Sequence, residues 1–165
     1  MGIRSEYGFT KQEYDHALFY NKRRFEIIFE GVGAVDNSPD VDMYLKIDGK
    51  YRALYVPENT FCLVNWLVIV YDGTTTTTQT EVGTLTRASG GNVTYTGGAV
   101  GTIDPTVTPT ANTTVQGLEV VVSDANSEAS AVYVVAKAEI LVIHTLATGQ
   151  SKFTTAATAA LTSAE

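Results

Sequence analysis

The sequence predicts a mainly β protein, an antiparallel β-sandwich or jelly roll with a short N-terminal helix and extended terminal arms. From residue 25 onward, most apolar and polar side chains alternate with a period of two, as they do in half-buried strands. The apolar runs are short and are separated by Gly, Asp and Asn turn signals, which predicts seven to nine strands. The chain has 165 residues, about one domain, and is 44% hydrophobic, which excludes a disordered chain.

Residues 9 to 21 predict the helix. Thr10 is a suitable N-cap, and Glu13 stands three residues later, where it completes a capping box. Tyr14 and Leu18 lie one turn apart on one face of this helix. At about eleven residues such a helix is too short to be stable alone in water, so we expect it to pack on another part of the protein.

The first strands follow directly. Phe25, Ile27 and Phe29 alternate with Glu26 and Glu30, which predicts a strand with one buried face. Asp48 and Gly49 indicate a hairpin turn. A two-residue turn would place Ile47 opposite Lys50 and mix the two faces. A three-residue loop with a bulge at Gly49 would instead pair Leu45 with Tyr51 and keep the apolar side chains on one face, so we expect that register.

Two later runs predict the longest strands. Residues 61 to 71 are apolar at nearly every position, which predicts a central strand that is covered on both faces. In residues 131 to 146 every second side chain is apolar, which predicts one long strand. A strand of this length is expected to bend or bulge midway. A shorter alternating run at 118 to 122 predicts another strand.

The segment between these strands, residues 74 to 114, is rich in Thr and Gly and poor in large apolar side chains. Thr is β-branched and favours extended structure, so we expect two thin strands, near 80–88 and 92–96. A long irregular excursion through Pro105 and Pro109 should follow them. A flexible linker is the alternative interpretation of this segment.

The chain shows no residue spacing that is typical of catalysis or of a resident cofactor or metal ion. His16 and His144 have no second histidine or cysteine at ligand spacing, and Cys62 lies in an apolar run, where thiols are usually inert. The acidic turn at 36–42 lacks the spacing of a calcium-binding EF-hand loop, although oxygen ligands for calcium are present in it. We therefore expect a protein that is not an enzyme and binds no cofactor.

The charge and hydropathy of the chain limit the classes of partner that we expect it to bind. Eleven Lys and Arg against eighteen Asp and Glu give a net charge of −7, which disfavours direct nucleic-acid binding. No apolar run approaches the ~20 residues of a membrane-spanning helix, and the first ten residues lack the apolar stretch of a secretion signal. We expect an N-terminal arm (1–24), a β-sandwich domain (25–146) and an Ala- and Thr-rich tail (147–165).

Both ends of the chain suggest contacts with other chains. Lys22, Arg23 and Arg24 form the one dense basic cluster, and aromatic side chains surround it, as they do at protein interfaces. The alternative is a solvated helix end, where cations interact favourably with the helix dipole. The tail carries two large apolar residues, too few to order it by burial. The predicted partner-contacting residues are Arg4, Tyr7, Phe9, Tyr14, Phe19, Tyr20, Lys22, Arg23, Arg24, Phe153 and Leu161.

In composition and architecture the chain resembles the decoration, or cement, proteins of tailed-bacteriophage capsids. The resemblance is carried by the 1–24 arm, the 74–114 excursion and the 147–165 tail, without a diagnostic motif. It implies a non-enzymatic virion protein that is made in the host cytoplasm, binds the outer capsid surface and stabilises the shell. It further implies as partners the major capsid protein and copies of the chain itself, most simply in a homotrimer.

Two other functions remain open. A tail-tube, neck or other head–tail subunit is also small and β-rich, and such a ring subunit would use a sheet edge and a long hairpin. A carbohydrate-binding or fibre-tip domain would instead expose Trp and Tyr on a flat face, whereas Trp66 lies in the most apolar strand.

Overall fold

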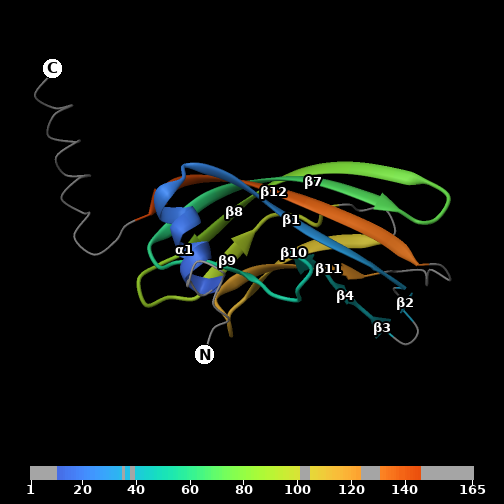
Figure 1. Ribbon diagram of the computed structural model, residues 1–165, viewed down its shortest axis with the longest axis horizontal. Coiled ribbons are helices and arrows are strands. Elements are labelled where there is room, and N and C mark those ends of the chain that lie inside the picture. The colour runs from blue at the N-terminus through green and yellow to red at the C-terminus, as the bar shows by residue number, and fades with distance from the viewer. Residues whose placement is uncertain (1–10, 35, 38–39, 101–104, 124–130, 146–165) are drawn as a thin grey trace, which may run out of the picture.

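The computed structural model describes residues 11–34, 36–37, 40–100, 105–123 and 131–145. The described chain is mainly β, with one short N-terminal helix and antiparallel, curled sheets that form a sandwich-like fold (Figure 1). Its elements are α1 (Lys11–Asn21), β1 (Arg24–Gly33), β2 (Asp36–Asn37), β3 (Asp40–Val41), β4 (Met43–Tyr44), β5 (Lys46–Ile47), β6 (Leu54–Tyr55), β7 (Thr60–Tyr71), β8 (Thr76–Arg87), β9 (Val93–Thr96), β10 (Thr106–Asn112), β11 (Gly117–Ser123) and β12 (Val132–Thr145).

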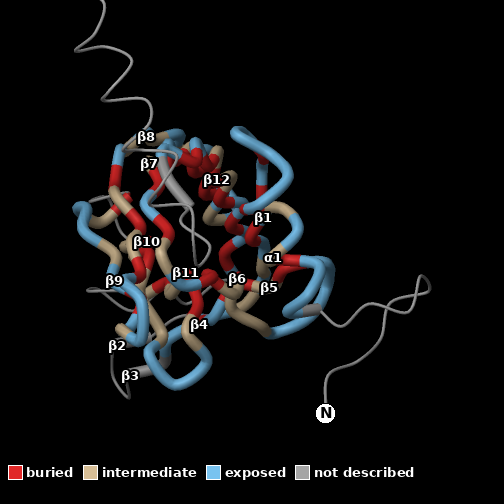
Figure 2. The backbone as a smooth tube through the Cα atoms, turned by 90° about the vertical axis from the view of Figure 1, so that its left-hand side faces the viewer, coloured by how far each residue is buried: buried red, intermediate tan, exposed pale blue. Residues whose placement is uncertain are grey.

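Two antiparallel sheets form the layers. The large sheet has the strand order β5-β1-β12-β7-β8-β9, and the small sheet has the order β10-β11-β4, with β6 also paired to β11. A two-stranded ladder, β2-β3, replaces the polar turn that the sequence predicts near residue 40. The buried positions lie between the layers, where the tube of Figure 2 is red.

The core is built from the side chains that point inward, which are every second residue of each long strand. On β12 every second residue from Val132 to Val142 is buried, as the apolar periodicity predicts. Trp66 of β7 is 2% exposed, packs against Phe29 of β1 at a centroid distance of 5.7 Å, and donates its indole N–H to the Tyr95 hydroxyl at 3.0 Å. Tyr95 lies over Gly83, where a β-carbon would overlap the phenol oxygen, so only a glycine fits beneath this ring.

The predicted helix is present, and Leu18 packs against the core. Asp15 and Phe19 are buried at 1% exposure, whereas Tyr14 is 50% exposed. Phe19 meets the ring of Phe25, at the start of β1, edge to face at 5.1 Å. The capping residue Thr10 lies outside the described residues.

The predicted register of the first hairpin is wrong. Ile47 and Lys50 exchange both backbone hydrogen bonds around a two-residue turn, in which Asp48 and Gly49 have φ angles of 52° and 72°. Two residues with positive φ are what a type I′ turn requires. The apolar side chains still lie on one side, because Leu45 is not paired within this hairpin. Its amide instead donates a hydrogen bond to the carbonyl of Val120 in the small sheet, at 3.0 Å.

Two further expectations are corrected. Part of the predicted irregular excursion is a strand, β10, which tolerates Pro109 because it lies at the edge of the small sheet. The bulge in β12 lies between Val142 and His144, near the end of the strand rather than midway.

Candidate functional site

The large sheet has one side that points away from the small sheet, which we call the outer face. At each register position a row of four side chains crosses this face, one each from β1, β12, β7 and β8. One such row runs Val32, Tyr133, Tyr71 and Thr76, and another runs Glu30, Val135, Ile69 and Thr78. Nothing among the described residues covers this face, so the prediction that both faces of residues 61–71 are covered is wrong.

Exposed apolar side chains are concentrated on the outer face. Nine of the fifteen large hydrophobic residues that are exposed in the described chain lie there, on all four strands. Leu63 and Leu67, which are half-buried, fill the gaps between them on β7. Soluble monomers rarely expose so continuous an apolar surface, and such surfaces usually mark interaction sites. The nine residues are Ile28, Val32, Phe61, Ile69, Tyr71, Val82, Tyr133, Val135 and Leu141.

The charged groups of this face occupy one half of it. On β7 and β8 every outward position is apolar, Thr or Asn, with no Asp, Glu, Lys or Arg. On β1 and β12 four charged side chains form two ion pairs: Arg24–Glu139 at 2.5 Å and Lys137–Glu26 at 3.6 Å. The hydrogen bond from Arg24 holds the pKa of Glu139 below its usual range.

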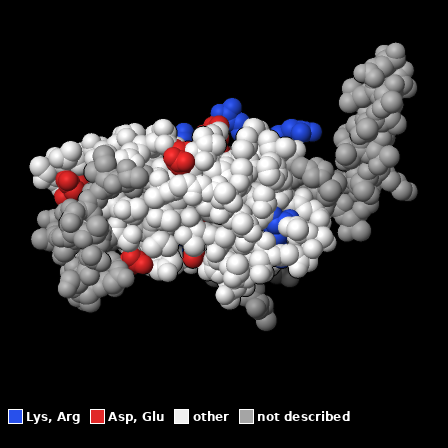
Figure 3. Space-filling model, turned by 180° about the vertical axis from the view of Figure 1, so that it is seen from behind, with Lys and Arg blue, Asp and Glu red and all other residues white. Residues whose placement is uncertain are grey.

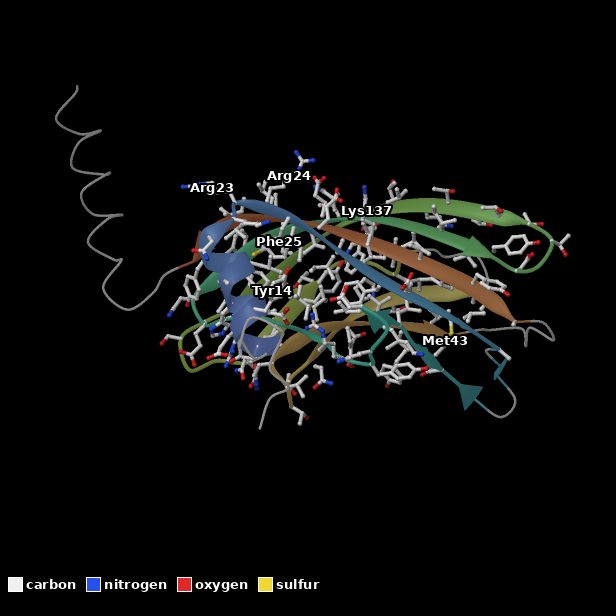
Figure 4. All side chains as sticks on the ribbon, viewed as in Figure 1. Tyr14, Arg23, Arg24, Phe25, Met43 and Lys137 are labelled. Atoms are coloured by element: carbon white, nitrogen blue, oxygen red, sulfur yellow. The ribbon has the colours of Figure 1, made fainter. Side chains whose placement is uncertain are left out.

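The figures show the same distribution. Arg24 and Lys137 point away from the sandwich, on the side opposite β10 and β11, whereas Phe25 points inward (Figure 4). In Figure 3 the outer face is seen edge-on along the top, where basic and acidic side chains project from it. Lys137 lies in the middle of this face, between Ile28 and Leu67, so the uncharged part is the half formed by β7 and β8.

A second cluster of polar residues fixes α1 to the domain. Asp15 accepts two hydrogen bonds from the Arg52 guanidinium, at 2.6 and 3.2 Å, and one from the Tyr55 amide at 3.0 Å. The Asp15 side chain is 1% exposed and that of Arg52 is 15% exposed, so this ion pair is largely shielded from water. This ion pair holds α1, which is too short to be stable alone, in place on the domain.

Arg87 continues this polar cluster beneath the helix. It donates to the Tyr55 hydroxyl at 3.0 Å and to the Val56 carbonyl at 2.8 Å. The His16 ring packs on Tyr55 at a centroid distance of 4.9 Å. Burial and the nearby Arg87 cation lower the pKa of His16, and the Asp15 carboxylate opposes them.

An open pocket of about 570 Å³ lies beside this polar cluster, between α1, the β5–β6 connection and the turn from β10 to β11. Its carboxylate is Asp15, which Arg52 already binds, and its most exposed ring is Tyr51. A single, ion-paired carboxylate provides neither a general acid–base pair nor a metal site. The pocket is lined by Gln12, Asp15, Tyr51, Arg52, Ala53, Tyr55, Thr114, Val115 and Gln116.

The lowered pKa of His16 predicts a pH-dependent stability. Because the fold favours the neutral ring, its contribution is complete above pH 6.5 and is lost as the pH falls below that value. Urea unfolding at pH 7.5 and 5.5 should show a larger acid destabilisation in the wild type than in His16→Phe, which keeps a ring at this position. Equal losses in the two proteins would contradict this assignment.

The structure places the predicted partner-contacting residues in three groups. Arg4, Tyr7, Phe9, Phe153 and Leu161 lie outside the described residues. Exposed positions are Tyr14, Tyr20, Lys22, Arg23 and Arg24, the last of which also borders the outer face. Phe19 is the correction: its ring is buried in its own chain at 1% exposure, so it cannot contact a partner.

Of the residues considered for chemistry, His144 pairs in register with Phe61, the neighbour of Cys62, whereas His16 lies on α1. Cys62 is fully buried, as predicted, and burial raises the pKa of its thiol to about 12, so the thiol is protonated at neutral pH. The side chain of His144 lies outside the described set. In the parts of the chain that the structure describes, no three His, Cys, Asp or Glu residues are grouped so that they could hold a metal ion.

The chain matches no protein-family model, no curated protein and no solved structure. None of the helical residues that are described forms a segment long and apolar enough to cross a membrane.

Sequence reasoning missed both the outer face and the Asp15–Arg52 pair. The signal for the outer face was the nearly continuous apolar sequence of β7. The same pattern also predicts a strand that its own chain buries on both faces, which is how we interpret it above. Asp15 and Arg52 lie far apart in the sequence and meet only through tertiary structure, so no local pattern links them.

Proposed function

We propose that this chain is a non-enzymatic structural protein of a virus particle that binds the outer surface of a capsid and stabilises the shell. The observation that carries the proposal is the outer face of the large sheet, a broad surface with nine exposed apolar side chains, to which β7 and β8 contribute no charged side chain. Such a surface fits protein–protein assembly. The compositional resemblance to capsid decoration proteins supports the specific role, with the major capsid protein and copies of the chain itself as partners.

The basic cluster contributes a second contact in this proposal. Lys22 and Arg23 are exposed at the junction of α1 and β1, on a chain of net charge −7. An acidic patch on the capsid would attract them, which orients the protein and raises the association rate. Arg24 is ion-paired with Glu139 and is therefore less available.

The binding test uses capsids of the major capsid protein from the same virus, prepared without this chain. Added wild-type protein should saturate the particles and raise the temperature at which they release DNA. The double variant Lys22→Glu/Arg23→Glu should bind more slowly and with weaker salt dependence, because the attraction to the acidic patch is lost. Stopped-flow light scattering at several salt concentrations measures both effects.

The matched control is Lys50→Glu/Thr113→Glu/Thr114→Glu, which changes the net charge by the same four units at exposed turn positions away from the outer face. This control should bind at nearly the wild-type rate. Equal slowing in both variants would show that net charge, and not the basic cluster, controls association. No binding by the wild-type protein at saturating concentration would overturn the proposed function itself.

A head–tail ring subunit is the second candidate. The hairpin of β7 and β8, with twelve residues in each strand, is the long hairpin that a ring subunit would use. Location of the chain in intact virions by electron microscopy separates the two roles. A carbohydrate-binding domain has less support, because the single Trp66 is buried and cannot stack on a sugar.

A further inference from the structure

We infer that a second copy of this chain covers the outer face, so that two large sheets pack face to face in a two-fold dimer. The inference deepens the self-association part of the proposed function and rests on it, but it does not depend on which particle the protein decorates.

The size of the outer face matches a stable interface. Four strands spaced about 4.8 Å apart and about ten residues long cover roughly 600 Å². Two such faces together bury about 1,200 Å², which reaches the range of specific protein–protein interfaces. The exposed Ile28, Ile69 and Leu141 would then become buried like core residues.

The charge of the outer face favours a second copy. The chain carries −7, but the outer face carries three cations, Arg24, Lys46 and Lys137, against three carboxylates, and both Arg24 and Lys137 are already paired with carboxylates of the same face. Two copies that meet here therefore repel each other far less than they would through the rest of their surface. Because these ion pairs are internal to each chain, they need no partner charge across the interface.

The asymmetry of the outer face selects one arrangement. A two-fold axis parallel to the strands, between β12 and β7, lays β7 and β8 of each copy over β12 and β1 of the other. Leu67 then faces Lys137 and Thr78 faces Glu30 of the second copy, so the charged half meets the uncharged half. An axis across the strands would instead bring Lys137 near the same residue of the second copy, and this repulsion disfavours it.

The full chain should therefore have a mass of about 35 kDa by light scattering, twice its 17.7 kDa. Ile69→Lys should raise the dimer dissociation constant about 100-fold or more, because it buries an unpaired charge in the interface. Tyr44→Lys is the matched control: it lies on β4 of the small sheet, is 49% exposed and should leave the dimer unchanged. Circular dichroism checks the fold, and Ile69→Thr, expected to weaken the dimer less, is the milder variant if Ile69→Lys does not fold.

A pair of opposite charges tests the arrangement. Thr78→Glu should weaken the dimer several-fold more than Thr78→Lys, because position 78 faces Glu30 of the second copy. Equal effects of the two variants would overturn the proposed axis. A monomer, a trimer of about 53 kDa, three times 17.7 kDa, or a dimer unaffected by Ile69→Lys would overturn the inference.

These outcomes are separable from failure of the proposed function. A wild-type monomer that binds capsids, and loses binding in Ile69→Lys, would assign the outer face to the capsid protein instead of a second copy. A dimer that binds no capsid would leave the dimer inference intact and remove the capsid role.

Discussion

Replacing Arg52 by Ala is expected to lower the free energy of unfolding by about 3 kcal/mol or more. The variant leaves the Asp15 carboxylate buried, at 1% exposure, without the guanidinium that donates two hydrogen bonds to it. A buried charge that loses its partner is among the most destabilising changes in a folded protein. Urea denaturation at pH 7 measures the effect, and the loss of α1 should accompany it in the far-ultraviolet circular dichroism.

Two further variants identify the buried charge as the cause. Adding Asp15→Asn to Arg52→Ala removes the negative charge and should restore part of the lost stability. Arg24→Ala breaks an ion pair of similar length whose arginine is 67% exposed, and should destabilise the protein far less than Arg52→Ala, because solvent screens the exposed pair. If Arg24→Ala and Arg52→Ala were equally destabilising, burial would not be what distinguishes the two pairs.

Trp66→Ala should have the largest effect in the core, about 3–5 kcal/mol. The side chain is 2% exposed and packs against Phe29, and its indole N–H donates to the hydroxyl of Tyr95. Truncation removes the packing, leaves a cavity between the sheets and frees a half-buried phenol. Calorimetry or urea denaturation of the variant measures the loss.

Phe61→Ala is the control on the same strand. Phe61 lies on the outer face and is 41% exposed, so its truncation should cost about 1 kcal/mol in the monomer. A loss as large as that of Trp66→Ala would mean that the outer face is already buried under the conditions of the measurement. Repeating it at several protein concentrations separates that case from a monomer effect.

The local elements were predictable because each has a period that its residues repeat. The helix near residues 11–21 and the strands around Phe25, Trp66 and Val134 follow from spacing and β-branched content alone. The residues Asp48 and Gly49 are themselves the signal of the two-residue turn that forms. The expected register was wrong because it kept Leu45 within the hairpin, whereas the Leu45 amide bonds to Val120, on a strand far along the chain. Tertiary hydrogen bonds outside the local window determined that outcome.

The candidate site could likewise be predicted only in part. The basic cluster at Lys22 and Arg23 is visible in the sequence, because charge clusters need no fold to be recognised. The outer face is not, because an apolar residue such as Ile69 has the same pattern whether its own chain or a second copy covers it. Only the sheet order shows that the described chain supplies no layer over β7 and β12.

The position of β12 in the large sheet has a consequence for biosynthesis. This strand comes last among the described elements, yet it lies between β1 and β7, and Arg24 at the start of β1 pairs with Leu141. During translation β1 therefore has no main neighbour until β12 has left the ribosome. Such non-local pairing has a high contact order and slows folding. The large sheet should form only after β12 has been synthesised, and chaperones would before then meet a chain in which the edges of β1 and β7 that face β12 are still unpaired.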